Sequence, residues 1–343
     1  MTGNTAKPKE WTAGEMLALS SAYWQPFALQ AGVVLDVFTA LDEMAGPGKT
    51  AAIPAVAARL GCNERSFGML VSALASLGFL GMNDGGITLP EASRKYLSRN
   101  SGDFIGYIIE HHTHLTEGWS KLAEAVRTGG RTRHSSVHTT DEAEREAFLM
   151  GMFNVAMNQA ERIAAALDLS GKKHLLDLGG GPGTYAVFFC KANPGMAATI
   201  FDRPASEKFA RGIVGRFGLE DRIDFRGGDF LLDSLPRGYD VAWLSQVLHG
   251  ETPEGAAKLV TRATQSLDPG GILAIQEFIL DDDRAGPPHS ALFGLNMLVG
   301  TQGGQTYTWS EITAMMRDAG AKDIRRLAVD LPQGCGILVG TKA

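Results

Sequence analysis

Long hydrophobic runs are absent from this sequence of 343 residues. The best candidate, residues 27–41, is interrupted by Gln30 and Asp36 and falls short of the roughly 18 residues that a membrane span needs. The amino terminus is polar, so we expect no secretory signal. The cysteines number only three and lie far apart, which is typical of reduced thiols in a cytoplasm. These absences predict a cytoplasmic protein without a membrane anchor.

An excess of basic charge is also absent. The formal net charge is −6 at pH 7, so there is no electrostatic reason to expect nucleic acid as a main partner. Hydrophobic residues make up 44% of the chain and charged residues 20%, which excludes disorder as the dominant state. The length is sufficient for two domains, each with its own core.

The first 103 residues have the pattern of helices followed by a hairpin. Residues 51–60 and 64–77 carry apolar side chains at helical spacing, separated by a turn at residues 61–63. Two short apolar runs around residues 83–86 then predict a β-hairpin. Helix, turn, helix and hairpin in this order predict a winged-helix-like domain.

Winged helices often bind DNA, but the charge of this segment argues against that function. Residues 1–103 contain eight Lys and Arg against nine Asp and Glu. The helix at residues 64–77, which would be the recognition helix, is mainly apolar and is better explained by burial against a partner subunit. We therefore predict residues 1–103 as the dimerisation domain of a homodimer.

The remaining chain divides into a helical link and an α/β domain. We expect residues 104–169 to be linking helices. From residue 170 to residue 343, strands and helices alternate, which is typical of a doubly wound, Rossmann-like parallel sheet. The predicted strands are residues 174–178, 197–201, 223–226, 239–245 and 271–279, followed by 324–331 and 335–341. The gap between the last two is too short for a crossover helix, so the final pair must be antiparallel.

The most informative motif is HLLDLGGGPGTYA, at residues 174–186. A buried strand ends in a glycine loop that precedes a helix, and such a loop lets a ligand lie against bare backbone. A nicotinamide-type loop requires a small residue at the position of Thr184. The glycines are instead spaced G-x-G-x-G, which suits a ligand without a pyrophosphate, such as S-adenosylmethionine.

Acidic residues follow the next two strands. Asp202 lies where a carboxylate binds both ribose hydroxyls, and Asp229 with Phe230 supplies an acceptor and a ring for adenine. We therefore expect S-adenosylmethionine as the cofactor. The predicted cofactor-binding residues are Asp177, Gly179, Gly180, Gly181, Gly183, Asp202, Asp229, Phe230 and Ser245.

Several segments then resemble a known family. LLDLGGGPG, FDRP, GGDF, VLHGETPE, LDPGGILAIQEF and GGQTYTWSE are similar, in this order, to segments of bacterial relatives of the plant caffeate-type and acetylserotonin-type O-methyltransferases. The resemblance covers nearly the whole chain, including a winged-helix-like dimerisation domain. It implies methyl transfer from S-adenosylmethionine to a small-molecule acceptor.

A histidine and a glutamate are the candidate catalytic pair. His249 and Glu277 follow the fourth and fifth strands, whose carboxyl ends border the ligand crevice of such a sheet. An imidazole can take up the proton of an acceptor hydroxyl, and a carboxylate can orient it. The resemblance implies the same roles, but Thr306 stands where the plant enzymes carry a second glutamate.

The resemblance implies that the linking helices at residues 104–169 line the pocket of the methyl acceptor, together with a later helical segment. The candidate substrate-binding residues are Phe153, Asn154, Met157, Phe293, Asn296 and Met297. We expect no metal site, because the histidines at positions 111–138 lack a metal-binding partner pattern. Three alternatives stay open: methylation of carbon or nitrogen, an S-adenosylmethionine-binding regulator without catalysis, and an NAD-linked oxidoreductase.

Overall fold

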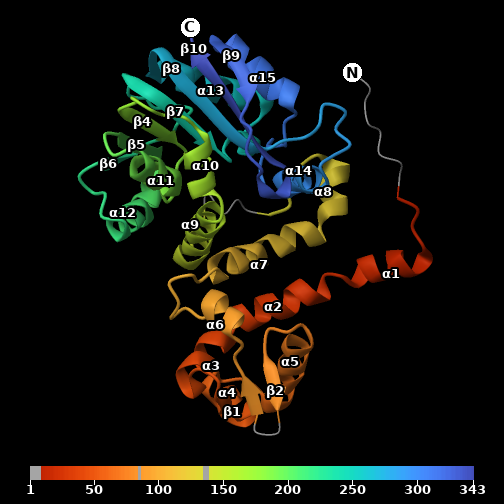
Figure 1. Cartoon of the computed structure of the whole chain (residues 1–343). Coiled ribbons are helices and arrows are strands. Elements are labelled where there is room, and N and C mark those ends of the chain that lie inside the picture. The colour runs from red at the N-terminus through yellow and green to blue at the C-terminus, as the bar shows by residue number, and fades with distance from the viewer. Residues whose placement is uncertain (1–8, 84–85, 134–138) are drawn as a thin grey trace. The chain divides into compact units, whose positions relative to one another are not determined.

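The computed structural model describes residues 9–83, 86–133 and 139–343 (Figure 1). The chain divides into two compact units, Met1–Thr113 and His114–Ala343. Helix α7 (Gly106–Ser120) contains the boundary, which therefore lies beyond residue 103. Within the described ranges, no helix has the length and hydropathy that a membrane crossing requires.

Unit 1 contains helices around a small antiparallel sheet. Its elements are α1 (Ala13–Ser21), α2 (Trp24–Val34), α3 (Val37–Ala45), β1 (Thr50–Ala51), α4 (Ile53–Arg59), α5 (Glu64–Ser76), β2 (Gly81–Asn83), β3 (Gly86–Thr88) and α6 (Glu91–Leu97). The strand order is β1-β3-β2, so the predicted helix, helix and hairpin are present. Asn63 explains where α5 begins, because its side chain accepts a hydrogen bond from the Ser66 backbone N–H at 3.1 Å.

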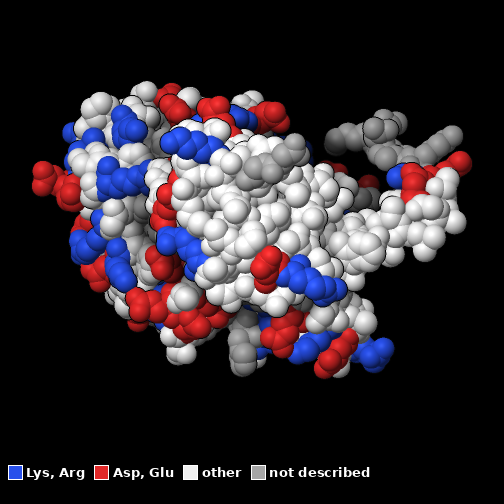
Figure 2. Space-filling view, turned by 90° about the horizontal axis from the view of Figure 1, so that it is seen from below, with Lys and Arg blue, Asp and Glu red and all other residues white. Residues whose placement is uncertain are grey.

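The surface of unit 1 exposes large apolar side chains on its first two helices. Leu17 is 71% exposed and Trp24 is 66% exposed, and Met16, Leu19 and Phe27 are also solvent-accessible. Figure 2, which views the molecule from below, shows a broad area without Lys, Arg, Asp or Glu, in which apolar and uncharged polar residues are both drawn white. Exposed apolar side chains that are grouped, as on α1 and α2, mark interaction surfaces.

Unit 2 is an α/β domain. Its helices are α8 (Leu122–Thr128), α9 (Glu142–Met157), α10 (Ala160–Ala166), α11 (Thr184–Ala192), α12 (Glu207–Arg216), α13 (Pro253–Ser266), α14 (Pro288–Gly300) and α15 (Trp309–Asp318), with short 3₁₀ turns η2 (Pro204–Ser206), η3 (Leu248–Gly250) and η4 (Pro332–Gly334). Its strands are β4 (His174–Leu178), β5 (Ala197–Asp202), β6 (Ile223–Gly227), β7 (Tyr239–Ser245), β8 (Leu267–Phe278), β9 (Ala321–Arg326) and β10 (Cys335–Lys342).

The seven strands of unit 2 form one sheet in the order β6-β5-β4-β7-β8-β10-β9. β4 to β8 pair in parallel, whereas β10 is antiparallel to both of its neighbours. The predicted doubly wound sheet with an antiparallel last strand is confirmed. Both faces are buried, because Val241 and Trp243 of β7 pack into one apolar cluster and Ala242 and Leu244 into another.

One predicted strand near the carboxyl terminus was misplaced. The sequence predicted residues 324–331, but β9 ends at Arg326. Leu327, Val329 and Leu331 pack against the core as irregular chain. These residues are apolar because they are partly buried, although they do not belong to a strand. A pattern of apolar residues does not distinguish a strand from buried irregular chain.

Candidate functional site

The glycine loop follows β4 and precedes α11. Gly179, Gly181 and Gly183 adopt positive φ angles of 72°, 52° and 75°, which favour glycine. A Cβ on Gly183 would lie 2.3 Å from Cδ1 of Ile200. The loop is therefore shaped by residues that cannot be larger, and it presents backbone at the amino terminus of a helix.

Asp177, the buried residue before this loop, ties it to α11. Its Oδ2 accepts a hydrogen bond from the Ala186 N–H at 3.2 Å, whereas Oδ1 has no hydrogen-bond partner among the described residues. Burial, together with a smaller contribution from the nearby Asp202 carboxylate, raises the pKa of Asp177 to about 7. A buried acceptor without a partner at the loop is consistent with a ligand there.

Asp202 and Asp229 lie at the ends of the next two strand units. Asp202 Oδ2 accepts from the Gly181 N–H at 2.6 Å, and burial raises the pKa of Asp202. Asp229 Oδ1 accepts from the N–H groups of Leu231 and Leu232, which fixes the turn that carries Phe230. The structure thus brings Asp202 to the glycine loop, and it holds Asp229 through its own turn.

The predicted catalytic pair is in direct contact. His249 in η3 and Glu277 at the end of β8 are joined by a 2.7 Å contact between Nδ1 and Oε2. Glu277 Oε1 also accepts from the Leu248 N–H at 2.7 Å and, more weakly, from the His249 N–H at 3.4 Å. An ionised carboxylate only accepts hydrogen bonds, so in the neutral imidazole Nδ1 carries the proton and Nε2 has the lone pair. The arrangement can hold a base in one tautomer.

Three predicted pocket residues lie along α14. Phe293 packs edge-on against the His249 ring, with centroids 4.8 Å apart. Asn296 Oδ1 accepts a hydrogen bond from Trp119 Nε1 at 3.1 Å, and Met297 is buried. This face of α14 therefore borders the catalytic pair.

The predicted pocket residues of α9 lie in different environments. Phe153 is part of the hydrophobic core, beneath the Arg216 guanidinium, whose carbon lies 5.6 Å from its ring centroid. Asn154 is partly buried, and Met157 is 37% exposed. These contacts do not bring Phe153 to His249.

Thr306, which the resemblance places at the position of the plant enzymes' second glutamate, is buried against α14. A Cβ on Gly294 would lie 2.9 Å from Thr306 Oγ1, and a Cβ on Gly304 would lie 2.3 Å from the His249 carbonyl oxygen. The chain after α14 therefore packs closely on η3. His249 is supported from this side by backbone and not by a second carboxylate.

A polar cluster beside β7 was not anticipated from the sequence. Ser245 Oγ donates to Gln276 Oε1 at 2.9 Å, and the side-chain amides of Gln246 and Gln276 lie 3.2 and 3.3 Å from Cys335 Sγ. Burial raises the pKa of the Cys335 thiol to about 11, so the thiol stays protonated. The Ser245 side chain is therefore hydrogen-bonded to the neighbouring strand. No local sequence motif indicates these contacts.

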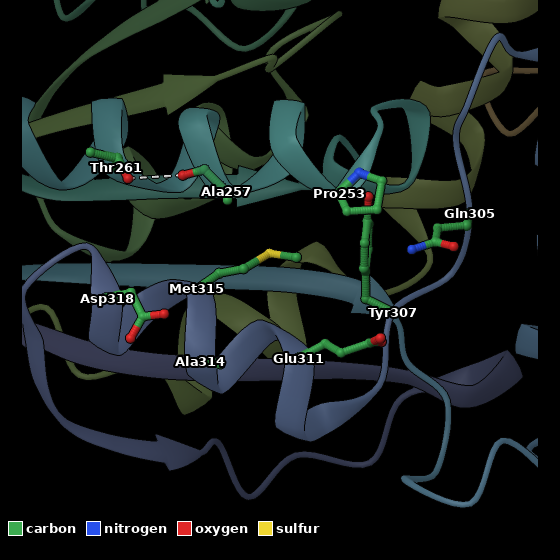
Figure 3. Close-up of a pocket in the computed structure, with 9 residues that line it drawn as sticks. All are labelled: Pro253, Ala257, Thr261, Gln305, Tyr307, Glu311, Ala314, Met315 and Asp318. Atoms are coloured by element: carbon green, nitrogen blue, oxygen red, sulfur yellow. Dashed lines mark hydrogen bonds between the residues drawn. The ribbon is translucent and has the colours of Figure 1, made fainter.

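A groove of about 320 Å³ lies between α13 and α15, on another part of unit 2 (Figure 3). Its lining residues are Pro253, Ala257, Thr261, Gln305, Tyr307, Glu311, Ala314, Met315 and Asp318. Glu311 caps α15 through the Thr308 N–H and pairs with Arg284. The groove includes neither member of the catalytic pair and no residue of the glycine loop, so we assign it no catalytic role.

Within the described ranges, no group of three or more His, Cys, Asp or Glu side chains is placed to hold a metal ion. His134 and His138, which belong to the histidine-rich segment of the sequence, lie outside the described residues.

Comparisons with known proteins identify the family of this chain. Residues 119–322 match the O-methyltransferase domain family, and residues 17–99 match the O-methyltransferase dimerisation domain family. The chain is 33% identical to a 3-hydroxy-5-methyl-1-naphthoate 3-O-methyltransferase of Streptomyces sahachiroi, over 100% of this chain and 99% of that protein. It is also 33% identical to the tetracenomycin polyketide synthesis 8-O-methyl transferase TcmO of Streptomyces glaucescens, over 94% and 96% of the two chains.

Solved structures show the same architecture. Human N-acetylserotonin methyltransferase in complex with SAM has a TM-score of 0.84 and 26% identity, covering 98% of this chain and 99% of that one. These findings confirm the resemblance seen in the sequence and the expected methyl donor. The chain belongs to the family of S-adenosylmethionine-dependent O-methyltransferases.

Proposed function

We propose that this enzyme methylates a phenolic or enolic hydroxyl of a small aromatic acceptor, with His249 as general base. The observation that carries the proposal is the 2.7 Å contact between His249 Nδ1 and Glu277 Oε2 at the carboxyl ends of β7 and β8. Those strand ends border the ligand crevice of an open α/β sheet. A base in a fixed tautomer at this place suits the removal of a hydroxyl proton.

The donor would be held by residues at the ends of β4, β5 and β6. The glycine backbone at residues 179–183 would face its methionine portion, Asp202 its ribose, and Asp229 with Phe230 its adenine. Asp177 and Ser245 support this site from the sheet, because their side chains bond to α11 and Gln276. When bound, S-adenosylmethionine supplies the methyl group, whose bond to sulfur breaks as the bond to the acceptor oxygen forms.

His249 and Glu277 have different roles in the transfer of the acceptor proton. The Nε2 lone pair of His249 accepts the hydroxyl proton, and Glu277 stabilises the imidazolium that results. Phe293 fixes the ring plane by its edge-on contact, so the base needs no reorientation during the reaction.

The acceptor would be aromatic and bound by α9, α14 and the end of α7. Two relatives named above act on a hydroxynaphthoate and on a tetracenomycin polyketide. The planar side chain of Phe293 next to the base offers a surface for a ring of this kind. Phe153, Asn154, Met157, Asn296 and Met297 complete the proposed acceptor set.

We further propose that the protein is a homodimer through unit 1. This unit matches the dimerisation domain family and exposes Leu17, Trp24 and Phe27 on α1 and α2. Burying these side chains in a second copy would remove apolar surface from water.

The test compares wild type with His249→Ala. We expect S-adenosylmethionine to bind both proteins with dissociation constants within about twofold in calorimetric titration, and NAD to bind neither. Turnover with a phenolic acceptor should fall by about 10²- to 10⁴-fold in the variant, the range of general-base catalysis. His174→Ala is the matched control, because His174 is exposed at the amino end of β4. Unchanged turnover in His249→Ala would remove the general-base role.

A further inference from the structure

An arginine is held between α14 and the end of α7 that belongs to unit 2. A Cβ on Gly300 of α14 would lie 2.3 Å from Nη2 and 2.7 Å from Cζ of Arg133. A Cβ on Gly118 of α7 would lie 2.8 Å from Cδ of the same side chain. The guanidinium therefore lies against the backbone of Gly300, and the aliphatic part of the Arg133 side chain packs against Gly118.

The backbone before this side chain is also fixed. The N–H groups of Thr132 and Arg133 donate to the Val299 carbonyl oxygen at 3.0 and 3.1 Å, and Thr132 Oγ1 donates to the Gly118 carbonyl oxygen at 3.2 Å. The Nε atom of Arg133 is shielded from solvent. The position of the arginine is therefore set by the fold of unit 2, unlike that of a surface side chain that samples solvent.

A single face of α14 connects Arg133 to the catalytic pair. Phe293 contacts the His249 ring, and Gly300 contacts the guanidinium. These residues are seven positions apart, with Asn296 and Met297 between them, so all four lie on one face of the helix. A rise of 1.5 Å per residue places the two contacts about 10 Å apart along the helix axis.

The Arg133 guanidinium places a positive charge at the carboxyl end of this face of α14. Burial lowers the pKa of Arg133, and the Glu144 carboxylate opposes that shift, but an arginine keeps its proton in proteins. A partly buried guanidinium presents planar N–H donors that match a carboxylate.

We propose that Arg133 binds an anionic group of the acceptor, so that the preferred substrates are hydroxyarene carboxylates. The hydroxyl lies at His249 and the carboxylate lies near Gly300, about one fused ring system away. This inference rests on the proposed function, because it takes the hydroxyl at His249 as one end of the acceptor.

A purely structural role for Arg133 makes a different prediction. A cation at the carboxyl end of α14 stabilises that helix through its dipole whatever the acceptor is. Such a role predicts equal losses for charged and uncharged acceptors when the arginine is replaced. An acceptor site predicts a loss confined to charged acceptors.

The experiment uses matched pairs of probes, hydroxybenzoates, hydroxycinnamates and hydroxynaphthoates, each with its uncharged carboxamide. The ratio of kcat/KM for acid over amide is measured in wild type, Arg133→Gln and Arg131→Gln, since Arg131 is an exposed arginine two residues away. We expect wild type and Arg131→Gln to prefer at least one acid by roughly 10- to 100-fold, the effect of a hydrogen bond to a charged group. In Arg133→Gln this ratio should fall to near one.

Binding gives a second readout that does not depend on turnover. Titration of the preferred acid into the complex with S-adenosylhomocysteine should show weakened binding in Arg133→Gln and unchanged binding of the amide. An unchanged acid-to-amide ratio in Arg133→Gln, or a wild-type preference for the amides, would overturn the role of Arg133 and leave the proposed function intact. Methylation of no hydroxyarene at all, with the methyl donor bound, would instead overturn the proposed function.

Discussion

In the proposed mechanism, Glu277 sets the tautomer of His249 by accepting the hydrogen bond from Nδ1. Replacing it with Gln places an amide opposite Nδ1, which favours the tautomer with the proton on Nε2. We expect Glu277→Gln to lower kcat by about 10²- to 10⁴-fold while the dissociation constant for the methyl donor changes little. Steady-state kinetics and calorimetry check this result, with Glu254→Gln on the exposed side of α13 as control.

The raised pKa of Asp177 predicts that the stability of the protein depends on pH. Its pKa is raised by burial to about 7 in the folded protein, so folding takes up a proton between the unfolded pKa near 4 and that value. Its contribution to the free energy of unfolding is therefore present below about pH 4 and is lost as the pH rises to about 7, at up to about 1.4 kcal/mol per pH unit.

Asp177→Asn lacks this titration. The stability of the variant relative to wild type should therefore increase as the pH rises from about 4 to about 7, measured by denaturant unfolding at a series of pH values. Asp224→Asn, at an exposed position of β6, should show no comparable trend. A difference that is flat across this range would contradict the raised pKa.

At the scale of elements, the turn from β7 into η3 determines where His249 lies. Gln246 adopts a φ of 58°, donates its N–H to the Gln276 carbonyl oxygen at 2.9 Å, and lies 3.2 Å from Cys335 Sγ through its amide. A positive φ is strained for side chains with a Cβ and most strained for β-branched ones.

This geometry ranks two substitutions. We expect Gln246→Val to destabilise the protein by about 1–3 kcal/mol and to lower kcat further than Gln246→Gly, which accepts the backbone angle. Thermal unfolding and kcat measurements check the order. Equal effects of the two variants would mean that the Cys335 contact, lost in both, outweighs the backbone angle.

The sequence predicted those elements whose signals are local. β4 and β7 begin and end at the predicted residues, because each is a mainly buried run bounded by polar residues or glycine. β8 begins four residues earlier than predicted, since its register shifts between Tyr239 and Val241 of β7 and the strand absorbs turn-like residues 268–271. A bulge of this kind depends on the neighbouring strand and has no local signal.

In the candidate site, too, features with a local sequence signal could be predicted and features that depend on distant segments could not. The glycine loop and the pair of His249 with Glu277 follow strand ends and could be placed from sequence. The contacts of Cys335 with Gln246 and of Arg133 with Gly118 and Gly300 join segments far apart in the chain. They depend on the sheet order and on helix packing, so no spacing in the sequence indicated them.

At the scale of the whole molecule, the exposed side chains of α1 and α2 predict the oligomeric state. Leu17→Glu combined with Trp24→Glu should convert a dimer into a monomer in sedimentation experiments, because charges at the centre of an apolar interface stay unpaired when buried. Leu232→Glu is the matched control, since Leu232 of unit 2 is 76% exposed. A dimer that persists in the double variant would place the interface elsewhere.

The position of β10 has a consequence for synthesis on the ribosome. β10 lies between β8 and β9, although it is the last of the seven strands of the sheet to be translated. Until it emerges from the exit tunnel, a nascent chain exposes the open edge of β8, the strand that ends with Glu277 and Phe278. The Glu277 carboxylate is thus made before the sheet that surrounds it is complete, so the enzyme cannot become active until β10 has been translated.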